Sequence, residues 1–138
     1  MPLAIALTAV FAQVALTFWA IFQMGRHRLA AIRREGLSHA EIALSAEAYP
    51  DRVKQFQANT HNQFETPILL YAGVGLAAGT GSANWGVAAG AALYVATRLW
   101  HRQIHVSSNH LPKRFRAYCA GLLALILLWL SLGLGLLL

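Results

Sequence analysis

The distribution of charge constrains this chain more than any other feature of its sequence. Basic residues fall into two blocks, Arg26 to Lys54 and Arg98 to Arg116, and long apolar segments without charge separate them. Only 12% of the residues are charged, whereas about a quarter are charged in an ordinary soluble protein. Basic loops that alternate with uncharged apolar segments are typical of a protein that crosses a membrane and keeps those loops on one face.

The net charge of +6 does not by itself indicate a nucleic-acid partner. Basic patches do give non-specific affinity for phosphate backbones. However, no recognised nucleic-acid-binding motif accompanies the charge in this sequence. We therefore expect membrane lipids as partners and no nucleic acid.

The apolar segments are long enough to span a bilayer, which requires about 20 residues each. The sequence predicts an all-α, single-domain integral membrane protein over residues 1–138, a four-helix bundle with spans at about 3–24, 54–79, 85–106 and 117–138. A signal peptide is the alternative for the first segment, but that segment lacks a basic n-region and its apolar core is too long. Because basic residues follow this segment, both termini are expected outside and the basic loops in the cytoplasm.

One acid, Glu65, lies at the edge of the second apolar segment. No further charge follows it until Arg98. Ionisable groups at such a position are costly and suggest a functional or assembly site. A buried guanidinium at Arg98 would need a carboxylate, and Glu65 is the only acid within an expected span. We therefore hypothesise that the two residues pair, either within one chain or across a subunit boundary.

Polar residues recur at helical spacing on two of the expected helices. At 100° per residue, one stripe on the second segment contains Arg52, Gln55, Asn59, Asn62 and Thr66, with Glu65 at its flank. The stripe on the third segment contains Tyr94, Arg98, His101, Arg102, His105 and Asn109. Lipid cannot satisfy polar groups, so both stripes must face other helices or a water-filled cavity. Arg102 has snorkelling to headgroups as an open alternative.

Three local patterns predict particular contacts. Gln13, inside the first span, is expected to form an interhelical hydrogen bond. Ser38 and Glu41 have the spacing of a capping box, which predicts the start of a short surface helix. The small residues of 86–90 permit close approach of another helix.

The residues that could carry chemistry favour anion binding over metal binding. His101 and His105 have the i, i+4 spacing of helical metal ligands, but Arg102 stands where the zincin pattern requires Glu. We expect no metal, and hydrogen bonding within the bundle for both rings. Cys119 is the only cysteine, so no intrachain disulfide is possible; we expect it to be a packing residue, with a nucleophilic thiol as the alternative. A face rich in Arg, Asn, Gln and His suits an anionic, amide-containing small molecule.

Several of these residues together resemble a known family. The segments 62–71 (NQFETPILLY) and 98–105 (RLWHRQIH), with Asn109, Arg114 and Phe115, resemble the MAPEG family, the membrane-associated proteins in eicosanoid and glutathione metabolism. The resemblance covers nearly the whole chain and is greatest to a bacterial branch. It implies a homotrimer, in a bacterial inner membrane, that binds glutathione between subunits near the cytoplasmic face.

The resemblance also implies roles for individual residues. Asn62 and Glu65 match the glutathione contacts of the second helix, and Arg114 best matches the arginine that stabilises the glutathione thiolate. The expected glutathione-binding residues are Arg52, Gln55, Asn62, Glu65, Tyr94, Arg98, His101 and His105. A cation near a thiol lowers its pKa and so raises the thiolate fraction.

The sequence therefore leaves two hypotheses about function. The leading hypothesis is a glutathione-dependent transferase or peroxidase that acts on lipophilic electrophiles from the bilayer. The alternative is a non-catalytic assembly or lipid-binding protein whose polar seam only holds the oligomer together. A transporter is less favoured, because no inverted repeat or pair of broken helices is evident.

Overall fold

In the computed structural model, which describes residues 1–43 and 45–137, the chain is all-α, as the sequence predicts. Over these residues it forms six helices and no strand. The helices are α1 (Pro2–Glu35), α2 (His39–Ala43), α3 (Asp51–His61), α4 (Pro67–Thr80), α5 (Trp85–Val106) and α6 (Leu111–Leu137).

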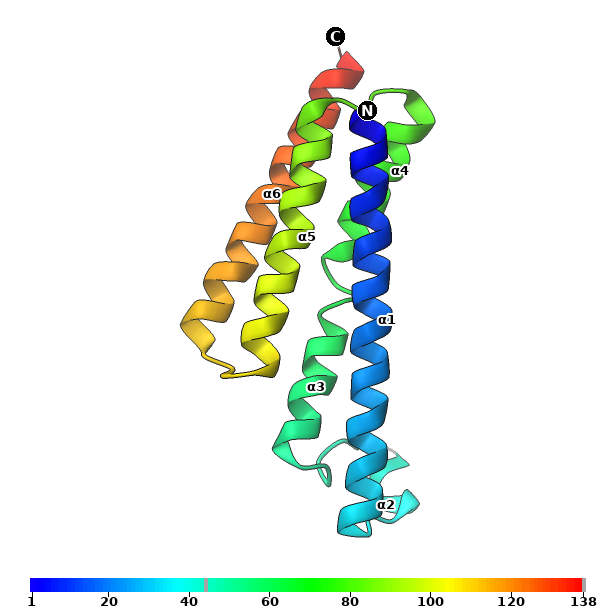
Figure 1. The fold of residues 1–138 in the computed structure, drawn as a ribbon, viewed down its shortest axis with the longest axis vertical. Helices are drawn as coiled ribbons and strands as arrows, with labels where there is room; N and C mark the ends of the chain where they lie inside the picture. Colours follow the sequence, from blue (N-terminus) through cyan, green and yellow to red (C-terminus); the bar gives the residue numbers. More distant parts are fainter. Residues whose placement is uncertain (44, 138) are drawn as a thin grey trace.

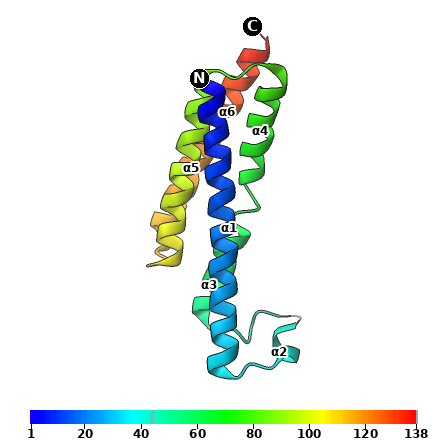
Figure 2. The same cartoon turned by 45° about the vertical axis from the view of Figure 1, so that its right-hand side comes forward.

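The longest helix, α1, runs the full length of the molecule, with α3 and α4 end to end beside it (Figure 1). Its contacts are with α3, α4 and α5, while α5 packs most extensively on α6. Both termini lie at one end, and α2 lies at the opposite end, as a second view also shows (Figure 2). Helices α5 and α6 stop well short of the α2 end, so α1 and α3 project beyond them (Figure 1).

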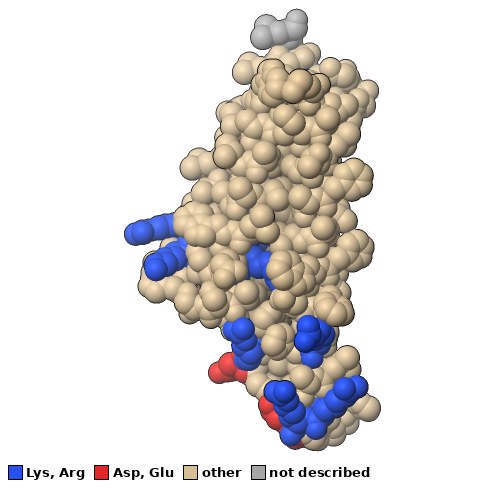
Figure 3. All heavy atoms as spheres, in the orientation of Figure 1, with Lys and Arg blue, Asp and Glu red and all other residues tan. Residues whose placement is uncertain are grey.

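Charge is segregated along the long axis of the molecule. In the space-filling view Lys, Arg, Asp and Glu lie in the lower half, and the half that carries the termini is without charge on this face (Figure 3). Helices α1 and α6 are each long and apolar enough to cross a membrane, whereas α4 is apolar but has only 14 residues. This segregation is the one that the sequence predicted from its two basic blocks.

The end of α1 is organised by a glycine cap and by the expected capping box. At 34 residues, α1 is about 51 Å long and exceeds a hydrocarbon layer of about 30 Å. Gly36 ends it in the left-handed conformation (φ 65°), which glycine adopts without strain. Glu41 then accepts hydrogen bonds from the Ser38 hydroxyl (2.8 Å) and N–H (2.9 Å), and these bonds lower the pKa of its carboxyl. The capping-box prediction is confirmed.

The second expected span is not one continuous helix, and this prediction is wrong. Helix α3 ends at His61 and α4 begins at Pro67. Proline has no N–H to donate, and its ring would clash with the carbonyl one turn earlier in a continuous helix. The chain instead tightens into i→i+3 turns, in which Gln63 N–H bonds Thr60 O and Phe64 N–H bonds His61 O, both at 2.9 Å.

The α5–α6 pair confirms the expected third helix and shows what its small residues do. Gly90 lies against the α6 backbone, since a Cβ there would come within 2.8 Å of Ala124 O and Leu128 N. The small residues thus bring two helices of the same chain together. Helix α6 begins at Leu111, six residues before the expected span, so Arg114 lies on a helix and not in a loop.

Candidate functional site

The two polar stripes predicted from the sequence face each other within one chain. We call this contact the α3–α5 seam. Its bonds run from Arg52 Nη1 to Val106 O (2.6 Å), from Gln55 Nε2 to His105 O (2.5 Å), between Asn62 Nδ2 and His105 Nδ1 (3.4 Å), and between Thr66 Oγ1 and Tyr94 Oη (2.8 Å). The first two bonds satisfy carbonyls at the end of α5, which have no partner within the helix.

Arg102 is the best-satisfied cation of the seam. It is 4% exposed, and it donates to Asn59 Oδ1 and to Gln23 Oε1 (2.7 Å). Its guanidinium also lies 5.2 Å from the centroid of the Trp19 ring, an arrangement favourable for a cation. Arg102 therefore ties α5 to α1 and α3, and the snorkelling alternative is wrong because the side chain does not reach the surface.

A second polar tie joins α1 to the break after α3. Gln13 Nε2 donates to Gln63 Oε1 at 3.0 Å, and both residues are buried. The interhelical bond predicted for Gln13 is thus confirmed. Its partner, Gln63, was not among the expected polar residues, although it lies four residues after Asn59 of the predicted stripe.

Arg98 does not form the predicted ion pair with Glu65 within the chain. Arg98 is 3% exposed, and its Nη2 donates to Asn62 O at 2.6 Å. Glu65 lies in the break before Pro67 and is exposed, and in the described residues no ion pair joins it to Arg98. The break explains the error, because it frees a backbone carbonyl for Arg98 and turns the carboxylate outward. A pair across a subunit boundary stays a prediction.

Beside the seam, a pocket of about 180 Å³ opens between α5, α6 and the break. We call it the α5–α6 pocket; its lining residues are Asn62, His101, Leu111, Arg114, Phe115 and Tyr118. It brings together three expected site residues, Asn62, His101 and Arg114. Arg52 and Gln55 are bonded at the end of α5 instead, and Glu65 is not part of the lining.

Arg114 is held at the edge of this pocket by Asn109. Its Nη1 donates to Asn109 Oδ1 at 2.6 Å. Asn109 adopts a left-handed conformation (φ 50°), which asparagine tolerates better than most residues, and its N–H bonds Ile104 O at 2.8 Å. The turn between α5 and α6 thus orients the arginine while leaving most of its donors free for a ligand.

The polar groups around the pocket suit an anion. His101 Nδ1 and Arg98 Nε are buried and without a hydrogen-bond partner among the described residues. The described lining contains no Asp or Glu. Buried polar groups are nearly always paired in native structures, so an unpaired ring nitrogen of a residue that lines a cavity calls for an explanation. An anionic ligand with hydrogen-bond acceptors fits this arrangement.

Tyr118 is the site residue that the sequence analysis missed. It lines the pocket, and its ring centroid lies 6.5 Å from that of His101. The available signal was its position four residues after Arg114, which places both on one face of a helix. The signal went unused because residues 113–116 were expected to form a loop and the helix was expected to begin at Ala117.

Taken together, the apolar helices and the polar seam at one end define a helical membrane protein. The family model described as MAPEG family matches residues 6–134 of 138. The chain belongs to the MAPEG family, as its motifs suggested. Neither the curated proteins nor the solved structures gave a match.

Proposed function

We propose that this protein is a glutathione-dependent transferase or peroxidase that acts on lipophilic electrophiles. The observation that carries the proposal is the α5–α6 pocket, in which Arg114, Asn62 and Tyr118 surround a small cavity beside His101, whose Nδ1 has no partner among the described residues. The exposed Phe115 at its edge (64%) gives an apolar substrate a surface to rest on.

Each polar residue of the pocket has a role in this proposal. Arg114 stabilises the glutathione thiolate, because a neighbouring cation lowers the pKa of a thiol. Asn62 offers hydrogen bonds to the amides and carboxylates of the tripeptide, and His101 lines the same cavity. Asn109 positions the arginine without being a ligand itself.

The chemistry balances without a further reactant. In a transfer, the thiolate forms a carbon–sulfur bond to the electrophile while the leaving group departs with the bonding electron pair. In a peroxidase reaction, two glutathione molecules are oxidised to the disulfide and a hydroperoxide is reduced to an alcohol and water.

The test is a titration of the purified protein with glutathione. Thiolate absorbance and conjugation of a model aryl halide are followed together. Both signals are expected to saturate with the same dependence on glutathione. No binding at millimolar glutathione would contradict the proposal.

The proposal includes an assembly and an orientation. We infer a homotrimer of four-span subunits in a bacterial inner membrane, with both termini outside and the charged end in the cytoplasm. Support comes from the family and from the segregation of charge along the molecule. Cross-linking in intact cells and thiol labelling of single-cysteine variants test the subunit number and the orientation separately.

A purely structural role for the polar residues is the second candidate. The seam bonds of Arg52, Gln55 and Thr66 lie within one chain, which favours a structural role for these three residues. The two candidates differ at Arg114, whose replacement by alanine abolishes thiolate formation if the protein is catalytic. If the polar residues only hold the structure together, the same replacement weakens the oligomer or has no effect.

A further inference from the structure

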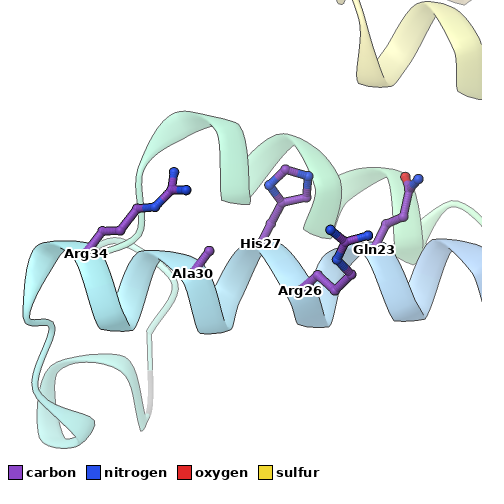
Figure 4. A pocket seen from close by; sticks show the side chains of 5 residues that line it. All are labelled: Gln23, Arg26, His27, Ala30 and Arg34. Atoms are coloured by element: carbon purple, nitrogen blue, oxygen red, sulfur yellow. The ribbon is translucent and has the colours of Figure 1, made fainter.

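A second polar cavity lies on α1, away from the α5–α6 pocket, and the proposed reaction does not use it. We call it the α1 cavity: it has a volume of about 250 Å³ and is lined by Gln23, Arg26, His27, Ala30 and Arg34. These side chains project from the same side of the helix (Figure 4). A smaller cavity shares His27, Ala30 and Arg34 with it and adds Arg52 of α3.

Two of the lining side chains are already fixed in place. His27 stacks on Phe56, with ring centroids 3.9 Å apart. Gln23 accepts a hydrogen bond from Arg102, which directs its oxygen inward and leaves its amide N–H groups available. The cavity therefore has an ordered floor and two exposed arginines at its rim.

The charge of this region is positive. Within the described lining of the α1 cavity there is no carboxylate, and Glu35 lines only the adjoining cavity. On α3, the carboxylate of Asp51 pairs with Lys54, with Oδ1 and Nζ 3.7 Å apart. Arginine and amide donors arranged in this way match the oxygens of a phosphate group.

The position of the cavity favours a membrane lipid as the molecule that would supply such a phosphate group. The cavity begins where the apolar part of α1 ends, and Phe18, Trp19 and Phe22 are 54–68% exposed just before it. Arg26 lies 5.8 Å from the centroid of the Phe22 ring, so the basic and aromatic surfaces are continuous. Of these residues, Trp19 is of the type that is enriched at the membrane–water interface. An acyl chain can follow the aromatic surface while its phosphate enters the cavity.

We propose that the α1 cavity binds the phosphate of an anionic phospholipid. Gln23 lines this cavity and accepts a hydrogen bond from Arg102 of the seam, so lipid binding is expected to stabilise the α1–α5 contact as well. The site is distinct from the α5–α6 pocket, and it does not depend on the glutathione proposal.

The test compares lipid binding by charge variants of the full chain in detergent, by native mass spectrometry. The wild type is expected to prefer phosphatidylglycerol to phosphatidylcholine with the same acyl chains. Arg26→Gln and Arg34→Gln are each expected to weaken phosphatidylglycerol binding about fivefold. Arg33→Gln is the matched control, because Arg33 is an exposed arginine next to Arg34 that does not line the cavity.

Three results would overturn the proposal. Equal loss in Arg33→Gln would show attraction to surface charge only. Equal binding of the two lipids by the wild type would contradict a site for anionic lipids, because phosphatidylcholine carries the same phosphate together with a compensating choline cation. Displacement of phosphatidylglycerol by inorganic phosphate at matched concentration would show a site for soluble anions instead. Because the replaced arginines are at the surface, unchanged melting temperatures are expected and confirm that the variants fold.

Discussion

The α3–α5 seam and the α5–α6 pocket are built from the same kinds of residues, but their side chains differ in how many hydrogen-bond partners they have. In the seam, Arg102 has two amide oxygens and an aromatic ring as partners. At the pocket, His101 Nδ1 is buried without a partner in the described structure, and Arg114 has one bond to Asn109. Both regions lie at the charged end of an otherwise apolar molecule.

The difference teaches that a polar stripe on a helix does not define a binding site. What decides is the element that the stripe faces. Where α5 faces α3, most polar side chains bond one another and the contact stabilises the fold, although Asn59 Nδ2 is buried without a partner among the described residues. Where α5 faces the start of α6, Arg114 lines a pocket with one described bond, and a ligand has a reason to bind.

The largest expected effect is the loss of activity when the pocket loses its cation. Arg114→Ala should lower the rate of glutathione conjugation about a hundredfold, because it removes stabilisation of a developing or existing negative charge. Steady-state kinetics measure this change. Lys113→Ala is the control, since Lys113 is exposed and does not line the pocket. Equal loss in both variants would contradict a specific role for Arg114.

Next in size is the loss of stability when the seam loses its best-satisfied residue. Arg102→Met should reduce the free energy of unfolding by about 2 kcal/mol, because it leaves the amide oxygens of Asn59 and Gln23 without their donor. Denaturation in mixed micelles measures this. Glutathione binding per folded molecule should stay at the wild-type level. A loss of glutathione binding without a change in the free energy of unfolding would contradict a structural role for Arg102.

A smaller effect compares a bonded pair within the chain with the pair predicted across a subunit boundary. In a double-mutant cycle, Asn59→Ala and Arg102→Met should show a coupling of about 1 kcal/mol, because the two side chains are bonded. For Glu65→Gln and Arg98→Leu, additivity within about 0.5 kcal/mol would contradict the pair predicted across a subunit boundary. Thermal melts in detergent provide both cycles. Strong coupling in the second cycle would place Glu65 beside Arg98 of a neighbouring subunit.

The smallest effect concerns the single amide bond between α1 and the helix break. Gln13→Leu should cost about 0.6 kcal/mol, the average for an interhelical polar contact in a membrane. Thr8→Val is the control, because the Thr8 hydroxyl bonds only Ala4 O within its own helix. If the melting temperature of Thr8→Val fell as much as that of Gln13→Leu, the Gln13–Gln63 bond would not be the cause of the lost stability.

Much of the fold was predictable because it depends on periodicity and on local chemistry. The limits of α5, the Ser38–Glu41 cap and the polar side chain at Gln13 each follow from spacing along the chain. The errors arose where the backbone departs from regular geometry. The break before Pro67 and the early start of α6 moved Glu65 outward and brought Tyr118 into the pocket.

The sequence by itself determined an all-α membrane protein, its charged end and its family. These properties depend on composition, helical period and motifs, which are present in the linear chain. Only the tertiary structure decided which polar groups satisfy one another. Arg102 and His101 are neighbours on α5, yet Arg102 bonds two amide oxygens whereas His101 Nδ1 has no partner among the described residues. The reason is that hydrogen-bond partners come from whichever helix each side chain meets, and that depends on packing between distant segments.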